Sequence, residues 1–486
     1  MTVTLARLIG AEASLPRGAE VLAIAGLTAD SRAVKPGFVF AALPGTNADG
    51  AQFIPQAIAN GAVAVVCAGG PAKVPVPVIA TPNPRRLFAL MAARFFGRQP
   101  DLVVAVTGTN GKTSVAAFVR EIWTSMGFRA ASLGTIGVVG PSGSTYLQHT
   151  TPDPVKLHEI AAALAEDHVD HLSIEASSHG LAQYRLDGLR LTAGAFTNIT
   201  RDHLDYHASF EDYFAAKMRL FEELLPQGAP AVVNADSPHG NEVARRAAAR
   251  GLRPFAVGRA GDALKLIAAE REGLGQRLEV AGPSRRHAVF LPLAGAFQVS
   301  NALVAAGLVI ATGGEEALAM HALESLKGAK GRLDLVGRSA TGAPVFVDYA
   351  HTPDALENAI AALRPYVTGQ LAVVFGCGGD RDRGKRPQMG AIAARLADIA
   401  YVTDDNPRSE DAALIRKEIL AACPGGIEIG GRADAIRAAV DALHGGDVLL
   451  IAGKGHEEGQ IVGKSVIPFS DHEAVQAALA GKDYHG

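Results

Sequence analysis

The hydrophobic positions of this chain form short, uninterrupted apolar runs that alternate with longer alanine-rich segments of helical periodicity. The runs are rich in Val and Ile and lack alternating polar residues, as expected of strands that crossover helices cover on both faces. In the first hundred residues such runs occupy 37–42, 62–66 and 76–79, and a helical pattern follows over 85–96. The pattern predicts an α/β fold built on parallel sheets.

A second group of elements begins after a polar linker at 97–101. The apolar run 102–107 opens this group, and a helical segment at 299–312 lies near its end. A third group starts near residue 331. Because one hydrophobic core rarely serves a chain of 486 residues, we predict three domains. They span residues 1–98, 99–330 and 331–486.

Composition narrows the class of protein. The chain is 48% hydrophobic and 20% charged, as ordinary globular proteins are. Its formal net charge of -3 supplies no basic field, so we expect no nucleic-acid partner. The three cysteines, Cys67, Cys377 and Cys423, are far apart and show neither metal-ligand nor disulfide spacing, which favours a reducing compartment. No apolar run approaches the roughly 18 residues of a membrane span, so we expect a cytoplasmic protein.

A glycine-rich loop follows the run 102–107 and leads into an amphipathic helical segment. In such a loop backbone N–H groups turn toward phosphate oxygens, Lys112 reaches the outer phosphates, and the Thr113 hydroxyl can bind Mg²⁺. A turn that only caps a helix is the alternative. We predict an ATP site, although Val106 stands where the general phosphate-loop pattern has glycine. The loop residues are Gly108, Thr109, Asn110, Gly111, Lys112, Thr113 and Ser114.

An acidic residue ends the apolar run around 172–174. Glu175 would lie at the carboxyl end of a strand in the sheet that carries the glycine loop, where a carboxylate can bind Mg²⁺. A solvated carboxylate at a strand end is the alternative. Ser177, Gln183 and Arg185 follow closely and suit a polar sugar-peptide ligand, which favours the functional interpretation.

Polar loops follow four apolar runs in the last third of the chain. In a parallel sheet these loops gather at one edge, where ligands bind. The loops combine arginines, which bind carboxylates bidentately, with acids, which accept hydrogen bonds from an ammonium group, and this mixture suits a zwitterionic amino acid. For residues 380–386 alone, a solvated run of charges is the alternative. The four apolar runs are 344–347, 371–375, 399–403 and 448–451.

The shortened glycine loop matches that of the Mur ligases and the folylpolyglutamate synthases, and the chain resembles the Mur ligases from end to end. Asp30-Ser31-Arg32 looks like part of their uridine-diphosphate site, although alone it would indicate a turn. Asp405-Asn406-Pro407-Arg408 matches the motif that marks their diaminopimelate-adding members. The resemblance implies an amino-terminal α/β domain that binds uridine diphosphate, a central P-loop ATPase-like domain with a parallel sheet, and a carboxyl-terminal Rossmann-like domain.

The same resemblance implies a cytoplasmic, monomeric enzyme of peptidoglycan synthesis. It would use ATP and Mg²⁺ to add meso-2,6-diaminopimelate to UDP-N-acetylmuramoyl-L-alanyl-D-glutamate through an acyl phosphate. A lysine-adding ligase is the nearest alternative, but lysine has no second carboxylate to pair with Arg408. A folylpolyglutamate synthase would lack the amino-terminal domain. A nucleotide-gated regulatory protein, which could keep the glycine loop, is the alternative from another class.

Roles for individual residues also come from the resemblance. Catalysis would involve Lys112, Glu175, His203 and Lys217, with Lys217 carried as a carbamate and Asn198 supporting the site. The metal ligands would be Thr113, Glu175, His203 and the Lys217 carbamate. ATP would also contact Asn301, Arg332 and Asp348. The UDP-muramoyl dipeptide would contact Ser31, Thr46, Asn47, Ala48, Thr150, Thr151, Ser177, Gln183 and Arg185, and diaminopimelate would contact Arg381, Asp405, Asn406, Pro407, Arg408, Gly453 and Glu457. For the base that deprotonates the amine, His351 and His203 are candidates.

Overall fold

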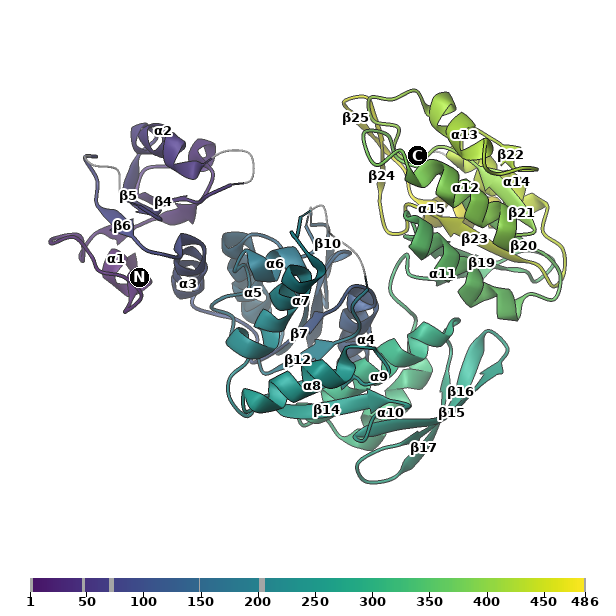
Figure 1. Cartoon of the computed structure of the whole chain (residues 1–486), viewed down its shortest axis with the longest axis horizontal. Helices are drawn as coiled ribbons and strands as arrows, with labels where there is room; N and C mark the ends of the chain where they lie inside the picture. Colours follow the sequence, from purple (N-terminus) through teal and green to yellow (C-terminus); the bar gives the residue numbers. More distant parts are fainter. Residues whose placement is uncertain (1–2, 46–48, 70–73, 148, 201–205, 485–486) are drawn as a thin grey trace. The chain divides into compact units, whose positions relative to one another are not determined.

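The computed structural model describes residues 3–45, 49–69, 74–147, 149–200 and 206–484 (Figure 1). The chain forms two compact units. The first comprises residues 1–267, 280–287 and 300–322, and the second comprises 268–279, 288–299 and 323–486. Both contain parallel sheets with helical crossovers, which confirms the predicted α/β class. No helix of the described part is long and apolar enough to cross a membrane.

The first unit begins with a small four-stranded parallel sheet in the order β3-β4-β5-β6. Helix α3 (Pro84–Phe96) packs against it through Leu87, Phe88 and Met91, which share a core with the strands. Asn83 caps this helix by accepting a hydrogen bond from the Arg86 N–H, and Pro84 occupies the first turn, where it needs no partner. The other elements are β3 (Gly26–Thr28), β4 (Phe38–Ala42), α2 (Ile54–Ala59), β5 (Ala62–Cys67) and β6 (Val78–Ala80).

A larger parallel sheet follows, with the order β8-β11-β7-β12-β13-β14. Because β7 lies between β11 and β12, the carboxyl ends of these three strands meet at one edge. The glycine loop, Glu175 and Thr197 lie at this edge. The bounds are β7 (Leu102–Thr107), α4 (Lys112–Ser125), β8 (Ala130–Gly134), α5 (Pro154–Glu166), β11 (His171–Glu175), α6 (Ser178–Ala182), β12 (Ala193–Phe196), α7 (Phe210–Arg219), β13 (Pro230–Asn234), α8 (Gly240–Ala249) and β14 (Arg253–Gly258).

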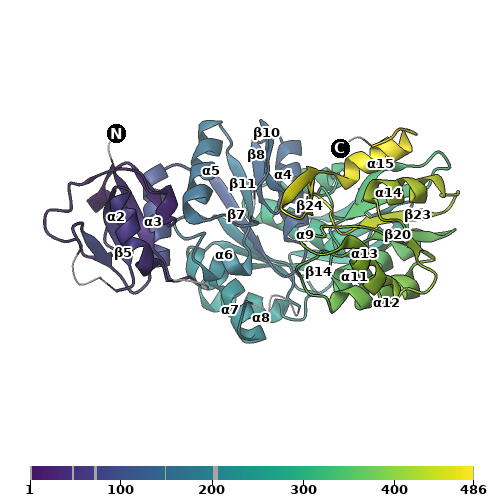
Figure 2. The ribbon, with the colours of Figure 1, turned by 90° about the horizontal axis from the view of Figure 1, so that it is seen from above.

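The second unit is built on a six-stranded sheet in the order β18-β19-β23-β20-β21-β22, parallel except for the edge strand β18. Alternate residues of its strands enter two cores: Phe346 packs with α11, α12 and α13, whereas Val345 and Val347 pack with α14 and α15. Figure 2 shows these two groups of helices on opposite sides of β20 and β23. The bounds are β18 (Asp334–Arg338), β19 (Pro344–Asp348), α11 (Pro353–Leu363), β20 (Leu371–Phe375), α12 (Lys385–Leu396), β21 (Ile399–Val402), α13 (Ala412–Leu420), β22 (Ile427–Glu428), α14 (Arg432–Asp441), β23 (Val448–Ala452), β24 (Gly459–Val462), β25 (Ser465–Pro468) and α15 (Asp471–Leu479).

Each apolar run that was predicted as a strand matches a strand of the structure within about two residues, but the buried strands β8 and β13 were not predicted. The pattern also located α9 (Ala296–Ala311), expected at 299–312. Among the other strands that were not predicted are β15 (Leu264–Glu272), β16 (Gly275–Ala281) and β17 (Arg286–Leu291). Their side chains are largely exposed or alternate between buried and exposed, so these segments lack the continuous apolar runs of the parallel strands.

Candidate functional site

The glycine loop at the end of β7 is held by the neighbouring strand β12. Gly108 has φ +152°, and a Cβ there would come within 1.9 Å of Thr197 Oγ1, so only glycine fits. Lys112 Nζ donates hydrogen bonds to Gly108 O at 2.9 Å and Thr109 O at 2.7 Å. Val106 pairs with β11 and β12 inside the sheet, so the turn begins at Gly108, which explains why no glycine is needed at position 106.

Glu175 faces this loop from the end of β11 and is 1% exposed. Its Oε2 accepts hydrogen bonds from Thr113 Oγ1 at 3.0 Å and from Thr135 Oγ1 at 3.2 Å, and its Oε1 accepts from the Thr135 N–H at 2.7 Å. Thr135 was not among the predicted site residues. A buried carboxylate beside two hydroxyls is a set of hard oxygen donors, which fits Mg²⁺.

Lys217 reaches the same loop from α7 and is also 1% exposed. Its Nζ donates to Gly108 O at 2.7 Å, so both lysine amines share one carbonyl oxygen. The Nζ also lies 4.4 Å from the centroid of the Tyr213 ring, whose hydroxyl is 2.9 Å from Thr109 Oγ1. Lys217 is therefore a buried residue beside the glycine loop and not a lysine on an exposed helix face.

Two asparagines lie against the loop. Asn198 Oδ1 accepts from the Asn110 N–H at 2.9 Å, and Asn198 Nδ2 donates to Asn110 O at 3.3 Å. Asn301, on α9, lies so near Gly111 that a Cβ there would be 2.4 Å from its Oδ1. His203 lies outside the described residues. Within those residues, no three His, Cys, Asp or Glu side chains are grouped as a metal site, so Glu175 would need the hydroxyl and modified-lysine ligands that the resemblance implies.

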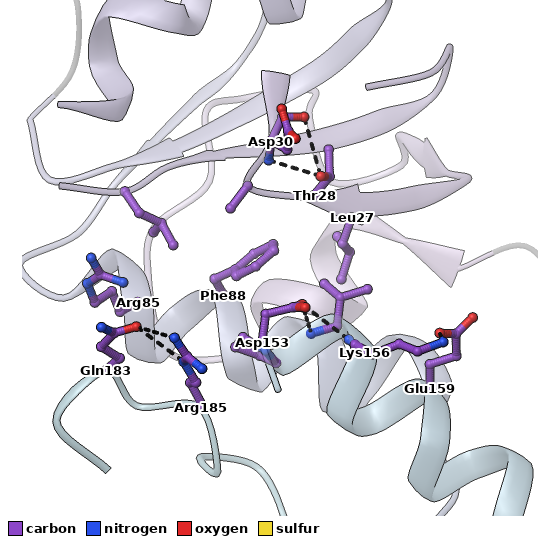
Figure 3. Close-up of a pocket in the computed structure, with 14 residues that line it drawn as sticks. Leu27, Thr28, Asp30, Arg85, Phe88, Asp153, Lys156, Glu159, Gln183 and Arg185 are labelled. Carbon is purple, nitrogen blue, oxygen red and sulfur yellow. Dashed lines mark hydrogen bonds and ion pairs between the residues drawn. The ribbon is translucent and has the colours of Figure 1, made fainter. Parts of the chain in front are cut away.

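A pocket in the same unit is lined by residues of β3, α3 and α5 and of the segment after α6 (Figure 3). Arg185 donates from Nε and Nη2 to Gln183 Oε1, at 3.2 and 2.8 Å, and Gln183 Nε2 donates to Tyr206 Oη at 3.0 Å. Thr28 and Asp30 lie across the pocket from this pair. The lining residues are Leu27, Thr28, Ala29, Asp30, Leu43, Arg85, Phe88, Asp153, Pro154, Val155, Lys156, Glu159, Gln183 and Arg185.

Arg85 enters this pocket from the first turn of α3 and was not predicted. Its Nη2 donates to Pro44 O. Burial lowers the pKa of Arg185, and the positive charge of Arg85 lowers it further, whereas Asp153 opposes the shift. Two guanidinium groups that repel one another in one pocket form a site suited to an anion.

Thr151 and Ser177 connect the pocket residues to Glu175. Thr151 Oγ1 donates to Glu175 O at 2.8 Å and lies 3.0 Å from Ser177 Oγ, and Arg185 Nη1 donates to Thr151 O at 2.5 Å. Thr150 Oγ1 lies 2.9 Å from Thr135 Oγ1. The structure therefore brings together these four predicted residues, Thr150, Thr151, Ser177 and Arg185, next to Glu175.

Of the amino-terminal residues that were predicted to contact the UDP-muramoyl dipeptide, only Ser31 is among the described residues. Ser31 is buried and donates from Oγ to Gln56 Oε1 at 3.0 Å, and it does not line the pocket, although its neighbour Asp30 does. Thr46, Asn47 and Ala48 lie outside the described residues. Their contacts stay predictions.

In the second unit, residues 405–408 form a loop after β21, which we call the 405–408 loop. Asn406 Nδ2 donates to Glu457 Oε2 at 2.9 Å, and Asn406 Oδ1 accepts from Lys454 Nζ at 3.0 Å. A Cβ at Gly453 would come within 2.8 Å of Asp405 Oδ2. The structure thus brings Asp405, Asn406, Gly453 and Glu457 together and adds the fully buried Lys454, which sequence reasoning missed.

The cations near this loop have different roles. Arg408 Nη1 donates to Gly379 O at 3.0 Å and remains half-buried. Arg381 is exposed. Arg386, however, is completely buried in ion pairs with Glu410 and Glu418, both at 2.8 Å, and Lys385 donates to His351 O at 2.9 Å. Arg386 and Lys385 therefore hold loops together.

Arg332 and Asp348 also belong to the second unit, whereas the glycine loop and Asn301 belong to the first. Asp348 Oδ2 accepts from the Leu333 N–H at 2.7 Å, and burial raises the pKa of Asp348 to about 6 despite the nearby Arg332 charge. Burial lowers the pKa of His351, whose Nδ1 lies 2.8 Å from Tyr349 O. A neutral imidazole can accept a proton, so His351 stays a candidate base.

The fold and the glycine loop define a phosphate-loop α/β protein. Family models then identify its family: Mur ligase family, catalytic domain, at residues 23–96; Mur ligase middle domain, at 106–309; and Mur ligase, glutamate ligase domain, at 331–455. The chain belongs to the Mur ligase family.

Relatives and solved structures agree with this assignment. Proteins of Mesorhizobium japonicum and Brucella melitensis, both named UDP-N-acetylmuramoyl-L-alanyl-D-glutamate--2,6-diaminopimelate ligase, are 58% and 55% identical. The alignments cover 94% and 96% of this chain and 95% and 96% of theirs. A solved ligase of the same name has TM-score 0.74 at 31% identity and 99% coverage of both chains. A Mycobacterium tuberculosis folylpolyglutamate synthase shares the fold, with TM-score 0.62 and 19% identity, over 76% of this chain and 92% of its own.

Proposed function

We propose that this chain is the ATP-dependent ligase that joins meso-2,6-diaminopimelate to UDP-N-acetylmuramoyl-L-alanyl-D-glutamate in peptidoglycan synthesis. The observation that carries the proposal is the set of hydrogen bonds that connects the glycine loop, through Thr113 and Glu175, to Thr151, Ser177 and Arg185. A nucleotide-activating site and a substrate pocket are thereby joined within one unit. The names of relatives that are more than half identical over nearly the whole chain support the same reaction.

Three domains would divide the work: residues 1–98 for the uridine diphosphate, 99–330 for ATP and catalysis, and 331–486 for the amino acid. The three family-model matches fall inside these ranges. We infer that the protein works in the cytoplasm as a monomer, without a nucleic-acid partner.

In the first half-reaction the terminal D-glutamate γ-carboxylate would attack the ATP γ-phosphorus, giving an acyl phosphate and ADP. Lys112 would leave Gly108 O and Thr109 O to bind the outer phosphates, as its position at the start of α4 allows. Thr113, Glu175, His203 and a Lys217 carbamate would hold Mg²⁺, which supplies positive charge to the transferring phosphoryl group. Asn301 would contact the adenine, and Arg332 and Asp348 would also contact ATP.

The shared carbonyl of Gly108 supports the modification of Lys217. Two ammonium groups that donate to one oxygen repel each other, whereas a carbamate beside Lys112 replaces that repulsion by attraction. The carbamate would also supply an anionic oxygen ligand beside Glu175, in a part of the described chain where no three His, Cys, Asp or Glu side chains are grouped as a metal site.

In the second half-reaction the amine of diaminopimelate would attack the acyl phosphate and release phosphate. Arg408 would pair with the second carboxylate of the amino acid, and Glu457 and Asp405 would accept hydrogen bonds from its ammonium groups. Arg381, Asn406, Pro407 and Gly453 would complete the pocket. His351 or His203 would take the proton from the attacking amine.

The test is ADP release, measured with a coupled enzyme while each component is omitted in turn. We expect continued ADP release over many turnovers only when ATP, Mg²⁺, the UDP-dipeptide and diaminopimelate are all present; without diaminopimelate, acyl-phosphate formation can give at most about one ADP per protein molecule. Continued release of ADP that does not depend on the amino acid or on the UDP-dipeptide would contradict the proposal and favour a nucleotide-gated regulatory protein.

A further inference from the structure

The hairpin formed by β24 and β25 is attached to the 405–408 loop. The Arg408 N–H donates to Ile461 O at 3.0 Å, and the Gly463 N–H donates to Arg408 O at 2.7 Å. These bonds form a parallel bridge between Arg408 and Val462. Both the N–H and the C=O of Arg408 are therefore bound, one to β24 and the other to the residue that follows it.

Two side chains strengthen the attachment. Gln460 is half-buried, and its Nε2 donates to Asp405 O at 2.6 Å. In the opposite direction, the Ile461 N–H donates to Asn406 Oδ1 at 2.9 Å. Each segment thus supplies one side chain that binds the backbone of the other.

Arg408 needs such support because of its backbone conformation. Its φ of +52° lies in the left-handed region, which a residue with a Cβ adopts only when its surroundings enforce it. The hairpin also needs the loop, since an isolated two-stranded hairpin is marginally stable in water. The two segments stabilise each other.

The hairpin also begins two residues after Glu457, which accepts from Asn406 Nδ2 at 2.9 Å. One continuous segment, 457–463, therefore contains the acid that would receive the ammonium group and is bonded to the backbone of the arginine that would receive the second carboxylate. It links these two recognition groups.

We propose that Gln460 is a positioning residue that selects an amino acid with a second carboxylate, by fixing the backbone of residues 405–408 and so placing the guanidinium of Arg408. This inference rests on the proposed function. Lysine has no group for Arg408 to bind, so its use should depend little on Gln460.

The test compares Gln460→Leu, which removes the donor at similar size, with Gln476→Leu, which makes the same change on the exposed face of α15. In Gln460→Leu we expect the KM for diaminopimelate to rise about 10-fold, as loss of one partly buried hydrogen bond predicts. The KM for ATP and for the UDP-dipeptide and the slow turnover of lysine should stay within about 2-fold of the unmodified protein. Gln476→Leu should change none of these values.

An unchanged KM for diaminopimelate, or an equal loss with both amino acids, would overturn the proposal. If Gln460→Leu does not fold, Gln460→Asn supports the same comparison, because its amide is one methylene too short to reach Asp405 O. Hydrogen exchange of the Arg408 and Gly463 amides tests the positioning role of Gln460 separately from the proposed ligase function, because the measurement needs no substrate. Faster exchange in the Gln460 variants is expected even if the unmodified protein does not use diaminopimelate, and unchanged exchange would contradict the positioning role.

Discussion

Thr113 and Glu175 are 62 positions apart in the chain, and the Thr113 hydroxyl donates a 3.0 Å hydrogen bond to the Glu175 carboxylate. Glu175 ends β11, and Thr113 lies in the first turn of α4, after the glycine loop that follows the adjacent strand β7. Because each is a ligand type that Mg²⁺ prefers, the pair links the glycine loop to metal-assisted phosphoryl transfer.

Replacing Glu175 by Gln should reduce kcat/KM by roughly 100-fold or more, because a neutral amide is a weak ligand for Mg²⁺. The Mg²⁺ concentration for half-maximal activity should rise as well, and a magnesium titration of ADP release measures both. Glu166→Gln, at the exposed end of α5, is the matched control and should leave both unchanged. Normal magnesium dependence in Glu175→Gln would exclude Glu175 as a ligand.

Loss of the Lys217 amine should abolish ligase activity if that amine carries a carbamate. Lys217→Ala leaves space for a small carboxylate, so added acetate or propionate should restore part of the activity. Lys417→Ala, on the exposed face of α13, should be fully active and insensitive to these acids. Full activity of Lys217→Ala without any acid would refute the carbamate.

Arg85→Gln should raise the KM for the UDP-dipeptide about 10-fold with little change in kcat, because the pocket would lose a charge that attracts the diphosphate. The KM for ATP should not change. Arg17→Gln, an exposed arginine of the same unit, is the control. If Arg85→Gln lowered kcat and left this KM unchanged, the guanidinium would not act in binding the diphosphate.

Asp348→Asn should stabilise the fold at pH 8 and much less near pH 4. Burial raises the pKa of Asp348 from 3.8 to about 6, so the folded state binds this proton more tightly than the unfolded state. The stabilisation of the folded state by this protonated carboxyl is therefore fully present below pH 3.8 and is lost as the pH rises through about 6. At pH 8 the folded state must bury the ionised carboxylate, which costs on the order of 1–3 kcal/mol, and the neutral amide of Asp348→Asn removes this cost.

Thermal unfolding of Asp348→Asn and of the unmodified protein at pH 5 and pH 8 measures the effect. The Tm difference should grow with pH, whereas the exposed Asp101→Asn should show no such trend. A constant or decreasing difference would contradict the shifted pKa.

Most of the strands that the sequence predicted are buried on both faces, although the buried strands β8 and β13 were missed. Such strands leave continuous apolar runs, and a carboxylate or glycine directly after a run, as at Glu175 and Gly108, is thereby placed at the sheet edge. The strands β15 to β17 expose much of their surface and leave no comparable signal.

Side-chain partners were less predictable. Arg386 and Arg408 look alike in the sequence, but Arg386 lies where α12 and α13 bring Glu410 and Glu418 to it, and only the packed structure shows this. Arg85 likewise reaches its pocket because α3 packs beside α5. The spacing of residues along the chain indicates neither the ion pairs of Arg386 nor the place of Arg85 in the pocket.

The most direct test of the central claim is a competition between amino acids. The protein is incubated with ATP, Mg²⁺, the UDP-dipeptide and equal concentrations of meso-diaminopimelate and L-lysine, and the product is identified by mass spectrometry. We expect a UDP-tripeptide that contains diaminopimelate, with the lysine product at least about 100-fold less abundant, because lysine leaves Arg408 unpaired. A lysine-containing product of equal or greater abundance would contradict the assignment.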